Sequence, residues 1–150
     1  MADVVDKATR SRMMSGIKGR NTSPELLVRK QLHALGFRYR IHCSHLPGKP
    51  DVVLPKHRVV IFIHGCFWHG HDCHLFKSPS TNVEFWENKI SRNRQRDAEV
   101  LADLEHKGWR VLTVWECSIK GKNKVGVPSV VRLVAEWIVS KEMRGEISGT

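Results

Sequence analysis

The chain has 150 residues, 41% hydrophobic and 27% charged, a composition that supports one buried core and excludes a wholly disordered protein. Twenty-five Lys and Arg against 15 Asp and Glu give a net charge of +10, which favours a polyanion partner, most often nucleic acid, over a basic surface kept for solubility. The longest aliphatic or aromatic run, Val59–Ile63, is too short to cross a bilayer, and the acidic start of the chain lacks the apolar segment of a signal peptide, so we expect a soluble cytoplasmic protein with no membrane partner.

The first part of the chain predicts a basic arm, a helix and a strand. Residues 1–22 are polar and basic without a strong hydrophobic period, and residues 1–40 alone contribute +6 to the net charge. A Ser-Pro pair opens a predicted helix over 23–35, and Gly36 stands where a left-handed C-cap belongs. The strict alternation of residues 37–42 predicts a half-buried strand.

Two further strands and a long helix follow. Short apolar strands over 51–54 and 59–63 have tight connections, and together with 37–42 they predict an antiparallel meander. The spacing of Thr81 and Glu84 is that of a capping box that opens the long helix.

The core-facing stripe of the long helix is interrupted by two polar residues. At helical spacing it reads Val83, Trp86, Ile90, Asn93, Asp97, Leu101 and Leu104. A buried carboxylate needs a partner or a metal, so Asp97 either pairs with Arg94 or Arg96 or belongs to an active site. A buried strand over 109–115 and a last helix over 128–143 complete one α/β domain with a mixed sheet.

Cysteine and histidine gather in the loop after the third strand. Three metal-ligating residues stand within eight positions of that loop, and a fourth follows the strand over 109–115: Cys66, His71, Cys73 and Cys117. Such sets form closed tetrahedral zinc sites. The alternative is a set of idle thiols beside surface histidines. We favour zinc, because a loop without a core of its own needs a metal ion to hold it together. His69 and His74 are alternatives to His71, whereas the isolated Cys43 is expected to be a small core residue.

An acid at the start of a strand is often an exposed turn residue, but Asp51 has a second interpretation. The neighbouring strand runs directly into His64, so the two strand ends could lie close together. A hard metal on Asp51, a histidine base and a supporting Asp97 would form a phosphodiester-hydrolysis site.

Two aromatic pairs stand near this region, Phe67-Trp68 in the loop and Phe85-Trp86 at the start of the long helix. Exposed aromatic pairs beside a basic arm suggest wedges between bases, with core packing as the alternative. Core packing is the better interpretation for Phe85, while the two interpretations of Trp68 are about equal.

The segment Ile61–His69, which reads Ile-Phe-Ile-His-Gly-Cys-Phe-Trp-His, resembles the signature of the very short patch repair (Vsr) endonucleases. The resemblance continues through residues 7–11, 46–51, 84–86 and 108–117, so it covers nearly the whole chain except about the last ten residues. It implies a restriction-endonuclease-like fold of the PD-(D/E)xK superfamily, with a mixed central sheet flanked by helices and a structural zinc. It also implies a single monomeric domain over 1–150, with residues 1–22 as an arm on DNA.

The activity implied by this resemblance is a strand-specific, Mg²⁺-dependent DNA mismatch endonuclease. Such an enzyme nicks double-stranded DNA 5′ to the thymine of a T:G mismatch, which arises when 5-methylcytosine deaminates. A repair polymerase and ligase then complete very short patch repair, and other mismatch-repair proteins are implied partners.

The resemblance also assigns roles to individual residues. Asp51 and the backbone carbonyl of Ile63 match magnesium ligands, His69 matches the general base, His64 and Asp97 match supporting catalytic residues, and Glu25 lies near the site. Cys66, His71, Cys73 and Cys117 match zinc ligands. Phe67, Trp68 and Trp86 match an aromatic wedge that enters the duplex from the major groove, and Met14 matches a residue that enters from the other side.

One departure concerns the strand over 59–63, which has no acid or lysine, so the (D/E)xK part of the superfamily motif is absent and a histidine base takes its place. A Thr is more familiar than Ile63 at that position. Two rival functions are a zinc-stapled DNA-binding module without catalysis and a nuclease of the same fold that acts on branched DNA or RNA.

Overall fold

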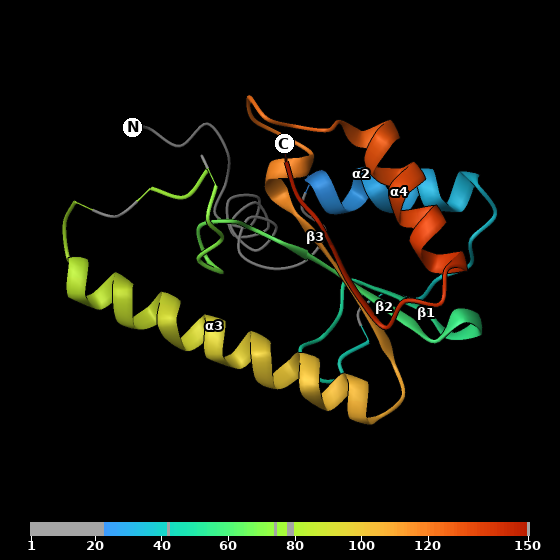
Figure 1. Ribbon diagram of the computed structural model, residues 1–150, viewed down its shortest axis with the longest axis horizontal. Helices are drawn as coiled ribbons and strands as arrows, with labels where there is room; N and C mark the ends of the chain where they lie inside the picture. Colours follow the sequence, from blue (N-terminus) through green and yellow to red (C-terminus); the bar gives the residue numbers. More distant parts are fainter. Residues whose placement is uncertain (1–22, 42, 74, 78–79, 150) are drawn as a thin grey trace, which may run out of the picture.

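The computed structural model describes residues 23–41, 43–73, 75–77 and 80–149, which form three α-helices and a four-stranded mixed sheet (Figure 1). In chain order the elements are α2 (Ser23–Ala34), β1 (Val52–Leu54), the 3-10 helix η1 (Pro55–His57), β2 (Val59–His64), α3 (Val83–His106), β3 (Arg110–Trp115), the 3-10 helix η2 (Glu116–Ser118), α4 (Val127–Val139) and β4 (Arg144–Ile147). The predicted α/β class with a mixed sheet is confirmed. The predicted arm over 1–22 lies outside the described residues. No helix in the described part of the chain is both long and apolar enough to cross a membrane.

The strand order is β1-β2-β3-β4, with β1 antiparallel to β2 and with β2, β3 and β4 parallel to one another. The parallel pairs are connected through α3 and α4, as parallel strands require a crossover. In the β2–β3 register His64 pairs with Trp115, so the carboxyl ends of these two strands meet at one edge of the sheet. The loops that carry the predicted site residues leave from this edge.

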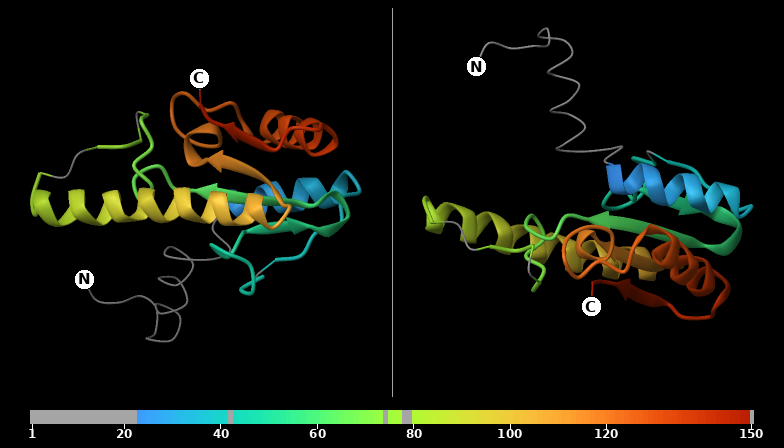
Figure 2. Two further views of the ribbon diagram at one scale, coloured as in Figure 1. Left: turned by 60° about the horizontal axis from the view of Figure 1, so that its bottom comes forward. Right: turned by 90° about the horizontal axis from the view of Figure 1, so that it is seen from above.

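The helices cover the sheet from both sides. Helices α2 and α4 lie on one face and α3 on the other (Figure 1). Figure 2 shows α2 and α4 next to each other on the side of the sheet that they cover, and the two helices contact one another directly. Val28 and Leu32 of α2 are buried in the same core cluster as Val134 of α4. The apolar stripes of both helices therefore face the strands.

The predicted strand over 37–42 is reduced to a single bridge, so the three-stranded meander is wrong. Arg40 and Val53 exchange two backbone hydrogen bonds of 2.8 and 2.9 Å, and the segment does not continue as a ladder. The alternation has another cause, since Phe37 and Tyr39 are partly buried against the core while Arg38 points to solvent.

The start of α3 also differs from its prediction. The helix begins at Val83 after Asn82, whose φ is 50° and whose side chain makes no capping hydrogen bond, so the Thr81 capping box is wrong. Val83 is 41% exposed rather than in the core. The reason is visible in Figure 1, where the amino-terminal half of α3 extends beyond the sheet and only the carboxyl-terminal half covers it. Leu104 is accordingly fully buried.

The last strand, β4, was not predicted. Only Ile147 of its four residues is buried, so the segment has too few apolar side chains to predict a strand. The helix before it ends at Val139 rather than near Met143, because the chain turns to bring Met143 and β4 alongside β3. A Cβ at Gly145 would come within 2.3 Å of Nε1 of Trp137, so this close approach requires glycine.

Candidate active site

Four metal-ligating side chains meet at the carboxyl edge of β2 and β3. Cys66 follows β2, and Cys117 lies in η2 directly after β3, so the parallel register brings both thiols to the same place. One ligand atom from each member of the set lies within 4.8 Å of all the others: Cys66, His71, Cys73 and Cys117. Three thiols and an imidazole at this spacing fit the donor set of a tetrahedral zinc ion.

The chemistry of these thiols also suits a cation. Burial raises the pKa of Cys66 and of Cys117, so neither thiol would ionise readily without a nearby positive charge. The backbone N–H of Gly149 donates to Cys117 Sγ at 3.3 Å, which supports a thiolate there. Of the two alternatives to His71, His69 is turned toward α3 and His74 lies outside the described residues. The prediction that Cys43 is a core residue is confirmed.

A second group consists of His64, at the end of β2, His69, in the following loop, and Asp97, on α3. Nδ1 of His69 lies 2.6 Å from Oδ2 of Asp97. An ionised carboxylate can only accept a hydrogen bond, so against such a carboxylate Nδ1 of His69 is the donor, and in the neutral imidazole Nε2 is the atom left with a lone pair. Asp97 therefore pairs with His69, not with Arg94 or Arg96, and this explains the polar interruption in the stripe of α3.

The two histidine rings are stacked. Their centroids are 3.7 Å apart and their planes differ by 3°. Burial lowers the pKa of His64 to about 3, and the adjacent His69 contributes to the fall. His64 is therefore neutral at physiological pH, beside a cavity of about 390 Å³ that lies between α3 and the sheet and is lined in part by His69 and Asp97.

Asp51 lies just before β1 and is tied to the end of β2. The backbone N–H of Ile63 donates to Asp51 Oδ2 at 2.6 Å. Glu25, only 1% exposed on α2, shares a hydrogen bond with Asp51. Nη1 of Arg29 lies 3.6 Å from Oε1 of Glu25. Burial raises the pKa of Asp51 to about 7, and the Glu25 carboxyl adds to the rise. Two neighbouring carboxyls, one buried and one half-buried, fit a hard divalent cation, which would favour the ionised form of both.

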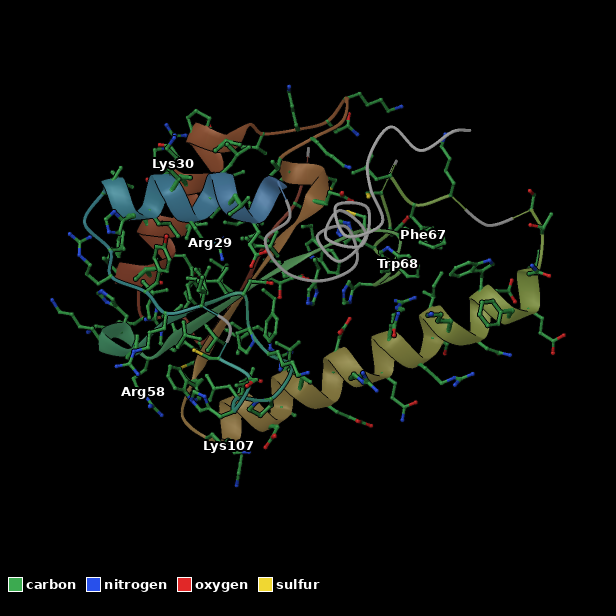
Figure 3. The ribbon with its side chains drawn as sticks, turned by 180° about the vertical axis from the view of Figure 1, so that it is seen from behind. Arg29, Lys30, Arg58, Phe67, Trp68 and Lys107 are labelled. Atoms are coloured by element: carbon green, nitrogen blue, oxygen red, sulfur yellow. The ribbon has the colours of Figure 1, made fainter. Side chains whose placement is uncertain are left out.

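Three aromatic side chains form a cluster over the amino-terminal half of α3. The ring centroids of Phe67, Trp68 and Trp86 are 5.4 to 5.6 Å apart. Figure 3 shows Phe67 and Trp68 side by side on the loop that faces this part of α3. Trp68 is 44% exposed, and Lys89 Nζ lies 5.5 Å from its ring centroid. The core position expected for Phe85 is wrong, because at 58% exposure it lies on the part of α3 that extends past the sheet.

Two residues at this edge were missed by the sequence analysis. Trp115 stacks on His71 at 4.1 Å between centroids and meets His64 edge-on at 5.4 Å. Glu146 accepts a hydrogen bond of 3.0 Å from the Trp115 indole N–H. The position of Trp115 two residues before Cys117 could have signalled its role, whereas Glu146 gave no signal because β4 was not expected.

The structure thus places the predicted residues at one edge of the sheet in three groups: the Cys/His cluster, the two histidines with Asp97, and Asp51 with Glu25 and Ile63. The aromatic cluster lies beside them. Met14, the other predicted DNA contact, lies outside the described residues.

Comparisons with known proteins identify a relative over nearly the whole chain and others over most of it. Residues 2–75 match the family described as DNA mismatch endonuclease Vsr. The DNA mismatch endonuclease Vsr of Escherichia coli (strain K12) is 44% identical over 147 residues, which cover 98% of this chain and 94% of that protein. The Type II nicking enzyme V.XorIIP of Xanthomonas oryzae pv. oryzae is 44% identical over 79% of this chain and 88% of its own. The Type II nicking enzyme V.NmeAIP of Neisseria meningitidis is 46% identical over 81% of this chain and 87% of its own.

Proposed function

Because the chain belongs to the family of the DNA mismatch endonuclease Vsr, we propose that it starts very short patch repair by nicking duplex DNA 5′ to the thymine of a T:G mismatch. The family relationship makes the chain a DNA nicking endonuclease, and therefore a hydrolase of phosphodiester bonds. The mismatch, the metal and the residue roles are our proposals. The observation that carries them is the hydrogen bond of His69 to Asp97 at the strand edge where Asp51 meets Glu25.

The DNA substrate suits the charge of the chain. A net charge of +10 attracts the phosphate backbone, and the resulting affinity should fall as salt is added. The basic arm over residues 1–22 is proposed to contribute phosphate contacts, with Met14 entering the duplex opposite the aromatic cluster. We propose that residues 1–150 act as one monomeric domain and hand the nicked strand to a repair polymerase and other mismatch-repair proteins.

Asp51, with Glu25 beside it and the backbone carbonyl of Ile63, is the proposed place for Mg²⁺. The raised pKa of Asp51 supports this proposal, because a cation would relieve the repulsion that ionisation creates next to Glu25. When bound, Mg²⁺ would stabilise the negative charge that develops on the scissile phosphate. Nearly complete burial of Glu25 keeps this carboxyl fixed beside Asp51.

His69 is the proposed general base. Its Nε2 lone pair is available to take a proton from the attacking water because Nδ1–H is held by Asp97. Asp97 fixes the tautomer and stabilises the imidazolium that forms. His64 packs face to face on His69 and stays neutral, so it supports the ring without adding a second positive charge.

The aromatic cluster is proposed to test the base step at the mismatch. Phe67, Trp68 and Trp86 already touch one another, so they can enter a duplex as one preformed wedge. A mismatched step unstacks at lower free-energy cost than a paired step, so insertion would select T:G sites and deliver the phosphate to Asp51.

The Cys/His cluster is proposed to hold structural zinc. Cys66 and His71 flank both Trp68 and His69 along the chain, so an ion at this cluster would fix the loop that carries the wedge and the base. Loss of zinc should therefore loosen both groups at once.

The fold is proposed to belong to the PD-(D/E)xK superfamily. Asp51 follows Pro50 just before β1, which pairs with β2 in an antiparallel hairpin, as that motif requires. The second half of the motif is replaced, because β2 carries only apolar side chains before His64 and the basic group comes from His69.

The test is a panel of end-labelled duplexes: one with a single T:G mismatch in a cytosine-methylation site, the paired duplex, and a four-way junction. We expect one Mg²⁺-dependent nick in the mismatched duplex alone. Tight binding without any nick would favour the DNA-binding module, and preferred cleavage of the junction would favour a nuclease for branched DNA. Metal analysis of the purified protein should find one zinc per chain, and its absence would remove the zinc proposal.

A further inference from the structure

Trp115 lies between the Cys/His cluster and the two stacked histidines. One side of its indole faces the ring of His71, with 4.1 Å between centroids and 11° between planes. It meets the ring of His64 at 5.4 Å and 70° and the ring of His69 at 6.2 Å and 70°, so Trp115 lies beside the stacked pair and contacts both imidazoles. The side chain is 9% exposed. Trp115 thus packs between His71 of the cluster and the stacked pair, and His69 of that pair is hydrogen-bonded to Asp97.

The orientation of Trp115 is fixed from the last strand. Its indole N–H donates to Glu146 Oε1 at 3.0 Å. Glu146 lies opposite Thr113 in the β3–β4 register, two residues from Trp115, so the strand pairing itself sets the position of the carboxylate. The acceptor comes from a part of the chain that the family motifs do not reach.

The chain around Glu146 is tightly fitted. Gly145 packs against Trp137, Ile147 is buried, and the Gly149 N–H reaches Cys117 Sγ. A Cβ at Gly149 would lie 2.6 Å from the Cys117 carbonyl oxygen, so only glycine allows this approach. The backbone of segment 144–149 therefore has little freedom, and it holds the exposed Glu146 side chain next to Trp115.

We infer that Trp115, held by Glu146, is a positioning residue that fixes the stacked His64 and His69 against the Cys/His cluster. The inference rests on the proposed function, since it assigns a support to the proposed base. His69 lies on a loop, and its tautomer needs the 2.6 Å contact to Asp97. A shift of about 1 Å in the position of a general base greatly lowers the rate of the chemical step. Loss of the support under the two imidazole rings should therefore slow nicking and leave DNA binding intact.

The experiment compares Trp115→Phe, Glu146→Ala and Glu146→Gln with the wild-type protein. Phe keeps a ring against His71 but has no indole N–H, Ala removes the acceptor, and Gln retains an acceptor oxygen. Glu136→Ala is the matched control, because Glu136 is an exposed glutamate on α4. The readouts are the single-turnover nicking rate at saturating T:G duplex, the DNA Kd, the indole N–H resonances, and the release of zinc to a chromogenic chelator.

We expect Trp115→Phe and Glu146→Ala each to slow nicking about tenfold with an unchanged Kd and to release zinc faster. Glu146→Gln should retain most of the rate. The indole N–H resonance that is missing in Trp115→Phe belongs to Trp115. This resonance should shift in Glu146→Ala and should not shift in Glu136→Ala. The double variant Trp115→Phe/Glu146→Ala should be no slower than the worse single variant, because both changes break the same hydrogen bond.

The inference is overturned if Glu146→Ala shifts the indole resonance while its nicking rate and zinc release match those of Glu136→Ala. It is equally overturned if the two single effects multiply in the double variant. Should Trp115→Phe fail to fold, the surface substitutions at Glu146 still decide the matter. A wild-type protein that nicks no duplex would refute the proposed function, whereas the resonance and zinc-release data would still test the packing of Trp115.

Discussion

Replacing Asp51 by Asn should abolish nicking and yet stabilise the folded protein at neutral pH without Mg²⁺. Burial raises the pKa of Asp51 from 3.8 to about 7, with a further contribution from Glu25. The folded state therefore holds this proton more tightly than the unfolded chain, so the free energy of unfolding falls as the pH rises between those two values. The proposed metal site is thus a place where ionisation destabilises the protein.

The magnitude follows from the same two pKa values. A rise from 3.8 to about 7 corresponds to roughly 4 kcal/mol in total, of which roughly 3 kcal/mol develops between about pH 5 and pH 8. Asp51 is only partly shielded from water, so we expect about 2 kcal/mol to be measurable. Asn keeps an oxygen for the Ile63 N–H and offers an N–H to Glu25, so it removes the charge without removing the hydrogen bonds.

Urea unfolding of zinc-loaded protein without Mg²⁺ measures this effect at both pH values. The stability advantage of Asp51→Asn should grow by about 2 kcal/mol from about pH 5 to about pH 8. Added Mg²⁺ should then stabilise the wild-type protein and not the variant. Asp103→Asn, which removes an exposed carboxylate 2.9 Å from Lys107, should change by less than about 0.5 kcal/mol. An advantage that does not grow with pH would refute the idea that Asp51 and Glu25 form a destabilised cation site.

Three further outcomes follow from the contacts. Asp97→Asn should slow single-turnover nicking by about 10²- to 10⁴-fold with unchanged DNA affinity, because the imidazolium of His69 loses its carboxylate; a wild-type rate would remove His69 as the base. Arg110→Ala should lower the free energy of unfolding in urea by about 3 kcal/mol, since the Arg110 guanidinium donates to the carbonyls of Trp137, Ile138 and Ser140 at the end of α4; a loss below about 1 kcal/mol would mean that these bonds add little. Trp68→Ala should reduce the preference for T:G over paired duplex in competition binding, and unchanged discrimination would mean that Trp68 only packs.

The sequence predicted those parts of the fold in which local chemistry and tertiary packing agree. Helix α2 and strands β1, β2 and β3 were expected because apolar periodicity and turn residues indicate the same boundaries. The segment over 37–42 shows the limit of this reasoning, because its alternation places Phe37 and Tyr39 on the edge of the core without forming a ladder. Strand β4 carries one buried side chain, too few for a period, and only its pairing with β3 defines it.

The site was predictable where residue types are chemically distinctive. Cys117 is 44 residues from Cys73, yet its place after a buried strand correctly suggested that it would reach the loop. The interruption of the α3 stripe likewise marked Asp97, although spacing alone could not choose His69 over an arginine as its partner. The link from Glu146 through Trp115 could not be predicted, because it depends on the β3–β4 register.

The central claim is that this edge of the sheet cuts one strand at a T:G mismatch. The most direct measurement maps the cut in a duplex whose two strands carry different labels, using wild-type protein and Asp51→Ala with Mg²⁺ present. The account predicts one break, immediately 5′ to the mismatched thymine, an intact opposite strand, and an Asp51→Ala protein that binds the duplex without cutting it. Cleavage of both strands, cleavage elsewhere, or equal nicking by Asp51→Ala would contradict it.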